Sequence, residues 1–222
     1  MLDVGRERLS MHFFPPLGVR VTTLSCLDIW LQRCGAMGVR CFVAVEVDDP
    51  GVLDALGSFQ AGLVGSGGDL KPVERENIHL TLKFLGDVDE GLLDEVKRVV
   101  RSLSFETFRM ALAETGAFPN LRRPKVIWAG VSGGVDELVV IFRELEARLV
   151  GLGFKREGRR FSPHITIARV RSGRNRDGLM GEVLRHRDTN FGGFKVGSVK
   201  LKRSVLTPRG PVYSTLAESS RS

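Results

Sequence analysis

The chain has 222 residues, of which 42% are hydrophobic and 27% charged, and its formal net charge at pH 7 is +7. This length is sufficient for one large domain with a core, and the basic balance favours polyanions such as RNA as partners. No apolar run is long enough to span a membrane, and we expect no secretory signal at the start of the given sequence. The three cysteines form no CxxC pair, which argues against a disulfide framework or a zinc site and favours a cytoplasmic location.

The first 36 residues differ from the rest of the chain, because they follow neither the period of a strand nor that of a helix. We interpret 1–36 as an atypical N-terminal extension that is disordered or precedes the true translation start at Met37, with a short helix at 24–31. The organised domain is predicted to occupy 37–222.

Regular elements are predicted from residue 40 onward. Residues 40–47 and 78–85 form apolar strands, 70–73 form a short one, and apolar side chains at helical spacing predict helices from Pro50 and around 92–100. Further strands are expected at 105–113, 124–131 and 162–170, with loops at 116–123 and 171–178.

A third helix is predicted from the apolar spacing between Leu138 and Leu152, and 183–184 are assigned to a short helix. Residues 194–206 alternate as one strand, and the turn 207–210 leads into a last strand at 212–216. Several strands adjoin through hairpin-like turns, so the chain predicts an α+β fold of antiparallel sheets with helices on one face.

One short sequence occurs twice. His79-Leu80-Thr81-Leu82 returns 85 residues later as His164-Ile165-Thr166-Ile167, an offset that suits a duplicated half-domain. Because strand side chains alternate, each strand presents an imidazole and a hydroxyl on one surface and two apolar side chains on the other. A pseudo-two-fold would bring both polar faces to one cleft.

Two imidazoles flanking one spot suit in-line attack on a phosphodiester, in which one histidine accepts a proton from water and the other protonates the leaving oxygen. The residues alone do not assign the two roles. The chain lacks the third or fourth ligand of a zinc site, the H-E-x-x-H motif and the G-x-S-x-G motif, so we expect no metal, no cofactor and no serine nucleophile.

With these motifs the chain resembles the 2H phosphoesterases, and within them the RNA 2',3'-cyclic phosphodiesterases once called 2'-5' RNA ligases. The resemblance covers about 37–217. It includes Glu74–Asn77, Lys83–Gly86, Gly116–Pro119, Val126–Gly130 and Leu206–Tyr213.

The resemblance implies a bilobal pseudo-two-fold fold, with two antiparallel sheets flanked by helices around a central cleft. It implies hydrolysis of a terminal RNA 2',3'-cyclic phosphate to a 2'-phosphate, with reversible 2'-5' ligation at the same site. His79 becomes the proton donor and His164 the proton acceptor, while Thr81, Thr166 and Arg169 bind the substrate. On a regular strand Arg169 would point away from His164, so a bulge or the end of the strand is needed to aim it at the phosphate.

Other residues leave alternatives open. Lys83 either lines the cleft on the His79 face or caps the strand in solvent, and Phe118 and Trp128 either stack on a base or pack in the core. The segment from Lys155 to Arg176 contains eight basic residues and reads as a track for the RNA backbone or as a solvated loop.

Rival functions follow from the same residues. In the first alternative the chain is a related phosphodiesterase that acts on a 2'-5' oligonucleotide or a nucleotide cyclic phosphate. In the second it is a non-catalytic RNA-binding module. For the favoured reading we expect an RNA partner with a cyclic-phosphate end, no membrane and a monomeric state.

Overall fold

The structure is a computed structural model that describes residues 38–208 and 210–219. The predictions for 1–36 lie outside these residues. Among the described helices, none has the length and apolar character that a membrane crossing requires. All described elements belong to the unit Met37–Ser222.

The first part of the unit alternates strands and helices largely as predicted. Its elements are β1 (Val39–Glu46), α2 (Pro50–Gly65), β2 (Leu70–Pro72), the 3₁₀ turn η1 (Arg75–Asn77), β3 (His79–Val88) and α3 (Glu90–Arg101). Aspartates cap both α-helices: the Asp49 carboxylate accepts from the Val52 N–H, and the Asp89 carboxylate accepts from the Gly91 N–H. These caps fix where the chain turns from strand to helix.

The second part continues with β4 (Phe108–Phe118), β5 (Val126–Gly133), α4 (Val135–Gly151), β6 (His164–Val170), α5 (Arg176–Arg185), β7 (Asn190–Val196), β8 (Lys200–Thr207) and β9 (Gly210–Glu218). Three predictions needed correction. β4 runs through the predicted loop to Phe118, α5 begins inside the predicted loop 171–178, and 194–206 is two strands, because β7 ends at Val196 and pairs with β4 while β8 pairs with β1.

The strands form one nine-stranded antiparallel sheet in the order β7-β4-β5-β6-β3-β1-β8-β9, with β2 on β6. Its two halves meet through the register pair Leu80–Ile165 of β3 and β6. We call β3, β1, β8 and β9 the His79 half-sheet, and β7, β4, β5, β6 and β2 the His164 half-sheet. The predicted α+β fold is confirmed, with its two antiparallel sheets present as the joined halves of this sheet.

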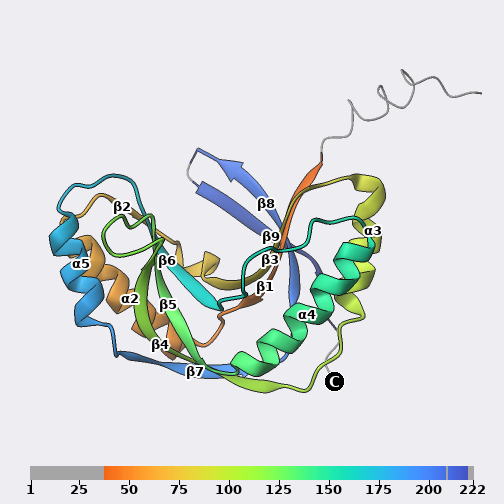
Figure 1. Cartoon of the computed structure of the whole chain (residues 1–222), viewed down its shortest axis with the longest axis horizontal. Helices are drawn as coiled ribbons and strands as arrows, with labels where there is room; N and C mark the ends of the chain where they lie inside the picture. Colours follow the sequence, from red (N-terminus) through yellow and green to blue (C-terminus); the bar gives the residue numbers. More distant parts are fainter. Residues whose placement is uncertain (1–37, 209, 220–222) are drawn as a thin grey trace, which may run out of the picture. The chain divides into compact units, whose positions relative to one another are not determined.

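The helices divide between the half-sheets. α3 and α4 pack on the His79 half-sheet, and α2 and α5 pack on the His164 half-sheet (Figure 1). Their apolar faces, such as Leu56 and Phe59 of α2 and Leu145 of α4, are buried against the apolar side chains of the strands. The opposite face of the joined strands is not covered by these helices.

The duplication extends beyond the two motifs. Pro50 and Val135, the first residues of α2 and α4, are separated by the same 85 residues as His79 and His164. α2 follows β1 of the His79 half-sheet but packs on the other half, and α4 crosses in the reverse direction. Each half-sheet is thus covered in part by a helix from the other repeat, which ties the two repeats together.

Candidate active site

The two His-x-Thr motifs lie side by side at the centre of the sheet. Leu80 and Ile165 are directly opposite in the antiparallel register, and both are fully buried on the helix-covered face. Because neighbours along a strand point to the other face, His79, Thr81, His164 and Thr166 share the opposite surface. The sheet therefore brings together both imidazoles and both hydroxyls predicted from the sequence.

His79 is held by two hydrogen bonds. Its Nδ1 lies 2.7 Å from the Asn77 carbonyl oxygen, and its Nε2 lies 3.0 Å from the Thr81 hydroxyl. A carbonyl can only accept, so Nδ1 carries a proton and Nε2 is the nitrogen that gains or loses one. The Asn77 side-chain amide donates to the Pro211 carbonyl 3.2 Å away, which ties this segment to β9.

His164 repeats the arrangement. Its Nδ1 lies 2.8 Å from the carbonyl oxygen of Ser162, two residues before it, as Asn77 is two residues before His79. The Nδ1 proton therefore fixes the same tautomer and again leaves Nε2 for proton transfer. The Phe118 ring contacts His164 edge-on, with ring centroids 4.9 Å apart.

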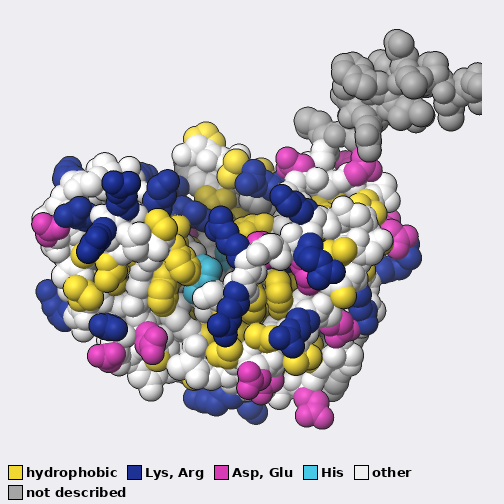
Figure 2. All heavy atoms as spheres, in the orientation of Figure 1, with side chains coloured by type: hydrophobic (Ala, Val, Ile, Leu, Met, Phe, Trp, Pro, Cys, Tyr) yellow, Lys and Arg dark blue, Asp and Glu magenta, His cyan; other side chains and the backbone are white. Residues whose placement is uncertain are grey.

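A cavity of about 550 Å³ lies over this surface and is lined by His79, Thr81, Thr166 and Arg169 among others. His164 does not line it, although two residues of its strand do. In Figure 2 a histidine side chain lies in a hollow, with Lys and Arg side chains around it. The cavity thus combines residues of both repeats with a cationic surround, as an anionic substrate requires.

A β-bulge at the matching position of each motif strand sets the direction of the side chains that follow the motif. In β3 the register skips Leu82, and in β6 it skips Ile167, 85 residues later. Each bulge reverses the alternation, so Arg169 reaches the cavity despite its odd spacing from His164. The Ile167 carbonyl freed by the bulge accepts from the Gln60 side chain and from the Val73 N–H.

Because the bulge in β3 reverses the alternation, both predictions made for Lys83 from the sequence are wrong. Lys83 neither lines the cleft nor reaches solvent: it is 7% exposed, and its Nζ lies 2.6 Å from a Glu146 carboxylate oxygen of α4. Phe84 takes the cavity-facing position in its place. Burial alone raises the pKa of Glu146, but hydrogen bonds from Lys83 and from the Glu157 N–H outweigh it and lower that pKa.

The electrostatics around His79 favour its neutral form. Burial lowers the pKa of His79; the Asn77 carbonyl opposes this, and the positive charges of Lys202 and Arg169 add to it. Glu46 is the register partner of His79 and raises that pKa, but its carboxylate also pairs with Lys200 and Lys202. The anion beside His79 is therefore largely neutralised.

Aromatic rings that the sequence reasoning did not single out surround His79. Phe42 and Tyr213 contact it with centroids 4.9 and 5.5 Å away, and both line the cavity. Both belong to strands of the His79 half-sheet far apart in the sequence. The sequence showed only that both residues alternate with others within apolar strands. Such alternation does not reveal which strands become neighbours in the sheet.

On the other half, Phe118 contacts His164, and Trp128 contacts Phe118 with centroids 5.4 Å apart. The basic side chains of the segment 155–176 are all exposed, and of them Arg169 lines the cavity. Among the described residues, no three His, Cys, Asp or Glu side chains gather as a metal site would require.

Comparison with known proteins identifies the family to which the chain belongs. Residues 47–128 and 130–213 match the family described as "LigT like Phosphoesterase". The RNA 2',3'-cyclic phosphodiesterase of Aeropyrum pernix is 40% identical over 163 residues, which cover 73% of this chain and 93% of that protein. The protein of the same name from Methanocaldococcus jannaschii is 37% identical over 180 residues, 81% of this chain and 99% of that one.

Solved structures agree on the fold. The crystal structure of TT0787 of Thermus thermophilus has a TM-score of 0.68 and 30% identity, covering 81% of this chain and 96% of that one. LigT of E. coli in its apo form has the same TM-score at 21% identity, covering 84% and 100%. The chain belongs to the LigT-like family of 2H phosphoesterases.

Proposed function

We propose that this enzyme hydrolyses a terminal 2',3'-cyclic phosphate on RNA to a 2'-phosphate by acid–base catalysis with two histidines. The observation that carries the proposal is the paired geometry at the centre of the sheet. Two imidazoles, each with Nδ1 held by the carbonyl two residues earlier, share one face of two joined strands. The names of the relatives supply the substrate class, RNA with a cyclic-phosphate end.

In the proposed reaction, Nε2 of His164 accepts a proton from water, and the water oxygen forms a bond to phosphorus. The bond from phosphorus to the 3'-oxygen breaks, and Nε2 of His79 donates the proton that this oxygen needs. The 2'-oxygen keeps the phosphate. The hydroxyls of Thr81 and Thr166 and the guanidinium of Arg169 hold the non-bridging oxygens and stabilise their charge in the transition state.

The environment of His79 bears on its role as donor. Burial lowers the pKa of His79 in the free protein, whereas a donor must be protonated when the bond breaks. A bound cyclic phosphate brings a negative charge next to the imidazole, and an adjacent anion raises the pKa of a histidine. The protonated donor is therefore formed with the substrate, which the pH profile tests.

The same groups can join RNA ends through a 2'-5' bond, with a hydroxyl of a second RNA in place of water, because acid–base catalysis is reversible. Hydrolysis dominates in water. A cyclic nucleotide or a 2'-5' oligonucleotide is the alternative substrate, and an RNA-binding module without turnover is the alternative class. A monomeric state and a cytoplasmic location stay predictions, which gel filtration and localisation in cells check.

The test is an assay in excess EDTA on a short RNA ending in a 2',3'-cyclic phosphate, with wild type, His79→Ala and His164→Ala. We expect wild type to leave a 2'-phosphate and each variant to lose about 10²–10⁴-fold in rate. The Arg143→Ala variant is the control, because Arg143 is an exposed side chain of α4 and does not line the cavity. Wild type that binds the RNA but leaves it intact would favour the binding module.

A further inference from the structure

A second cavity, of about 660 Å³, lies at the edge of the His164 half-sheet. It is lined by the end of β4, the loop that follows it, β5 and the end of α5, and it shares no lining residue with the cavity around His79. Its lining includes Gly116, Asn120, Arg122, Trp128, Leu184 and Arg187. β7 pairs with β4 as far as Ala113, and the Glu114 N–H donates to the Thr189 carbonyl 3.1 Å away, so β4 from Thr115 onward has no strand partner on this side in the described structure.

This cavity is joined to the active site by aromatic rings. Trp128 is the register partner of Thr166, so its side chain lies on the same face of the sheet as the catalytic motif. Its ring contacts Phe118 with centroids 5.4 Å apart, and Phe118 contacts His164 with centroids 4.9 Å apart. Two successive ring contacts therefore link His164 to the wall of this cavity, which places the cavity within reach of a nucleotide adjoining the reacting one.

Trp128 contributes its ring to the wall of the cavity. Its indole N–H is buried and has no acceptor among the described residues, so this donor is out of reach of a molecule in the cavity. The ring lies across Gly116, where a Cβ would come within 2.3 Å of it, so the glycine is what allows this position. What Trp128 offers a bound base is therefore its indole ring.

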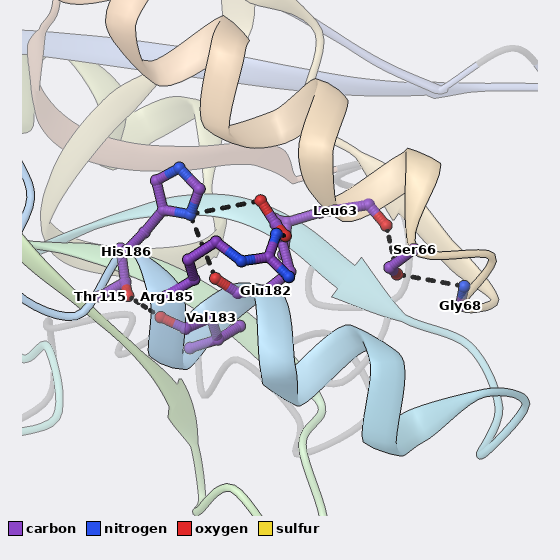
Figure 3. A network of polar contacts seen from close by, with 8 residues as sticks. All are labelled: Leu63, Ser66, Gly68, Thr115, Glu182, Val183, Arg185 and His186. Carbon is purple, nitrogen blue, oxygen red and sulfur yellow. Dashed lines mark hydrogen bonds and ion pairs between the residues drawn. The ribbon is translucent and has the colours of Figure 1, made fainter.

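The wall formed by α5 is fixed in place. The Thr115 hydroxyl of β4 donates to the Val183 carbonyl 2.7 Å away, and the buried Glu182 pairs with Arg185 and His186 (Figure 3). The His186 ring also contacts Phe59 of α2, with centroids 4.9 Å apart. These contacts hold α5 between β4 and α2, so the cavity is preformed, as ligand sites usually are.

Two cations stand at the cavity without carboxylate partners. Arg122 and Arg187 are exposed, and within the described residues neither guanidinium makes an ion pair. The loop that holds Arg122 is itself ordered, because the Asn120 side chain accepts from the Arg122 and Arg123 N–H groups at 3.0 Å. An indole ring and two guanidinium groups match a base and its phosphates.

We propose that this cavity binds the nucleotide that precedes the cyclic-phosphate end of the RNA. The base packs against the Trp128 ring, and Arg122 and Arg187 bind the backbone phosphates. The proposal rests on the proposed function, since it assigns a place to the RNA chain beyond the reacting nucleotide. A cyclic mononucleotide would fill only the cavity around His79, so the second cavity selects for RNA.

The test compares two substrates, a 2',3'-cyclic mononucleotide and a short RNA ending in a 2',3'-cyclic phosphate. In the double variant Arg122→Ala/Arg187→Ala we expect KM for the RNA to rise at least about tenfold, with kcat/KM for the mononucleotide within about twofold of wild type. Arg143→Ala on α4 is the control for loss of an exposed arginine away from the cavity and should change neither value. An unchanged KM for the RNA in the double variant overturns the proposal.

A binding measurement separates this proposal from the proposed function. Trp30 and Trp128 are the two tryptophans, so Trp30→Phe makes Trp128 the reporter. We expect a 2'-phosphate-ended RNA to change its fluorescence saturably, and the double arginine variant to weaken that binding at least about tenfold. If wild type hydrolyses neither substrate, the proposed function fails, but the titration still tests whether the second cavity binds RNA. The cavity proposal is overturned if RNA causes no fluorescence change, or if the double variant binds RNA as tightly as wild type.

Discussion

Leu80 of β3 and Ile165 of β6 are register partners where the two half-sheets meet, and both are fully buried. This pair determines the active site, because it places the residue on each side of Leu80 next to the residue on each side of Ile165. His79 is thereby set beside Thr166, and Thr81 beside His164. The Nε2 of His79 lies 3.0 Å from the hydroxyl of its own motif, and the hydroxyls of both motifs line the cavity with it, which is an arrangement suited to holding one phosphate.

Replacing Arg169 tests whether the bulge in β6 serves catalysis. We expect Arg169→Ala to lower kcat/KM on cyclic-phosphate RNA by about 10²-fold, because one preorganised charged donor to the transition state is lost. Arg169→Lys should recover part of the loss, since lysine keeps the charge but not the forked geometry. Steady-state kinetics measure both.

Arg171→Ala is the control, as Arg171 is exposed, two residues away and outside the cavity lining. We expect it to stay within about twofold of wild type. Equal losses for Arg169→Ala and Arg171→Ala would mean that general positive charge matters and not a contact with the phosphate.

The sequence was sufficient to predict the central strands, because His79–Leu82 and His164–Ile167 alternate so regularly that their polar faces are unambiguous. It was also sufficient to predict the helices from Pro50 and around 92–100, where apolar spacing and a preceding aspartate coincide. The α+β class followed from the order of these elements. All of these predictions rest on patterns within short segments of the sequence.

What could not be predicted depends on contacts between distant segments. The bulges at Leu82 and Ile167 reverse the side chains after them, and nothing in the alternation before them announces the reversal. Lys83 was therefore misplaced, although its buried partner Glu146 is apparent once α4 crosses to the His79 half-sheet. The gathering of Phe42 and Tyr213 around His79 likewise requires the strand order.

Removing one member of the buried pair Lys83 and Glu146 should destabilise the fold much more than replacing both. We expect Lys83→Met to lower the free energy of unfolding by about 3–5 kcal/mol, because it leaves the Glu146 carboxylate buried without its cation. Urea unfolding measures the change. The double variant Lys83→Met/Glu146→Leu should be much less affected, since replacing both charges removes the unpaired group.

Glu146 also accepts from the Glu157 N–H, and Lys83 donates to the Lys155 carbonyl 2.9 Å away, so the pair ties the segment before β6 to β3. A double variant as unstable as Lys83→Met would show that these links to the segment, and not the unpaired charge, account for the loss. Comparing the two variants separates the causes.

Two glycines should respond in opposite directions to alanine. A Cβ at Gly116 would lie 2.3 Å from the Trp128 ring, so we expect Gly116→Ala to cost about 1–3 kcal/mol of unfolding free energy. Gly57 lies within α2 and has nothing within 4 Å of its Cβ position, so Gly57→Ala should stabilise by about 0.5–1 kcal/mol. Chemical denaturation of both variants checks this, and equal values would contradict the position of Trp128 over Gly116.

The pH dependence of the rate distinguishes the roles of the two histidines. Burial lowers the pKa of His79 below its ordinary 6.5, so in the free protein its protonated form is lost at a lower pH than usual. In the intact pair the lower of the two pKa values governs the acidic limb whichever histidine donates, so the roles are read from the His164→Ala variant, in which His79 is the remaining member of the pair. If His79 is the proton donor, the residual kcat/KM of this variant falls as the pH rises through a pKa below 6.5, because kcat/KM reports the free enzyme. The fall in kcat should lie at a higher pH, since the bound phosphate raises the same pKa.

The opposite assignment predicts the opposite slope. If His79 were the proton acceptor, the residual kcat/KM of His164→Ala would instead rise as the pH rises through the lowered pKa of His79. NMR titration of the two imidazoles, assigned with His79→Ala and His164→Ala, shows whether the rate changes at the pKa of His79. Because both imidazoles keep Nδ1 on a carbonyl, the duplicated strands are alike in tautomer, and the different burial and charge around each must decide which one donates.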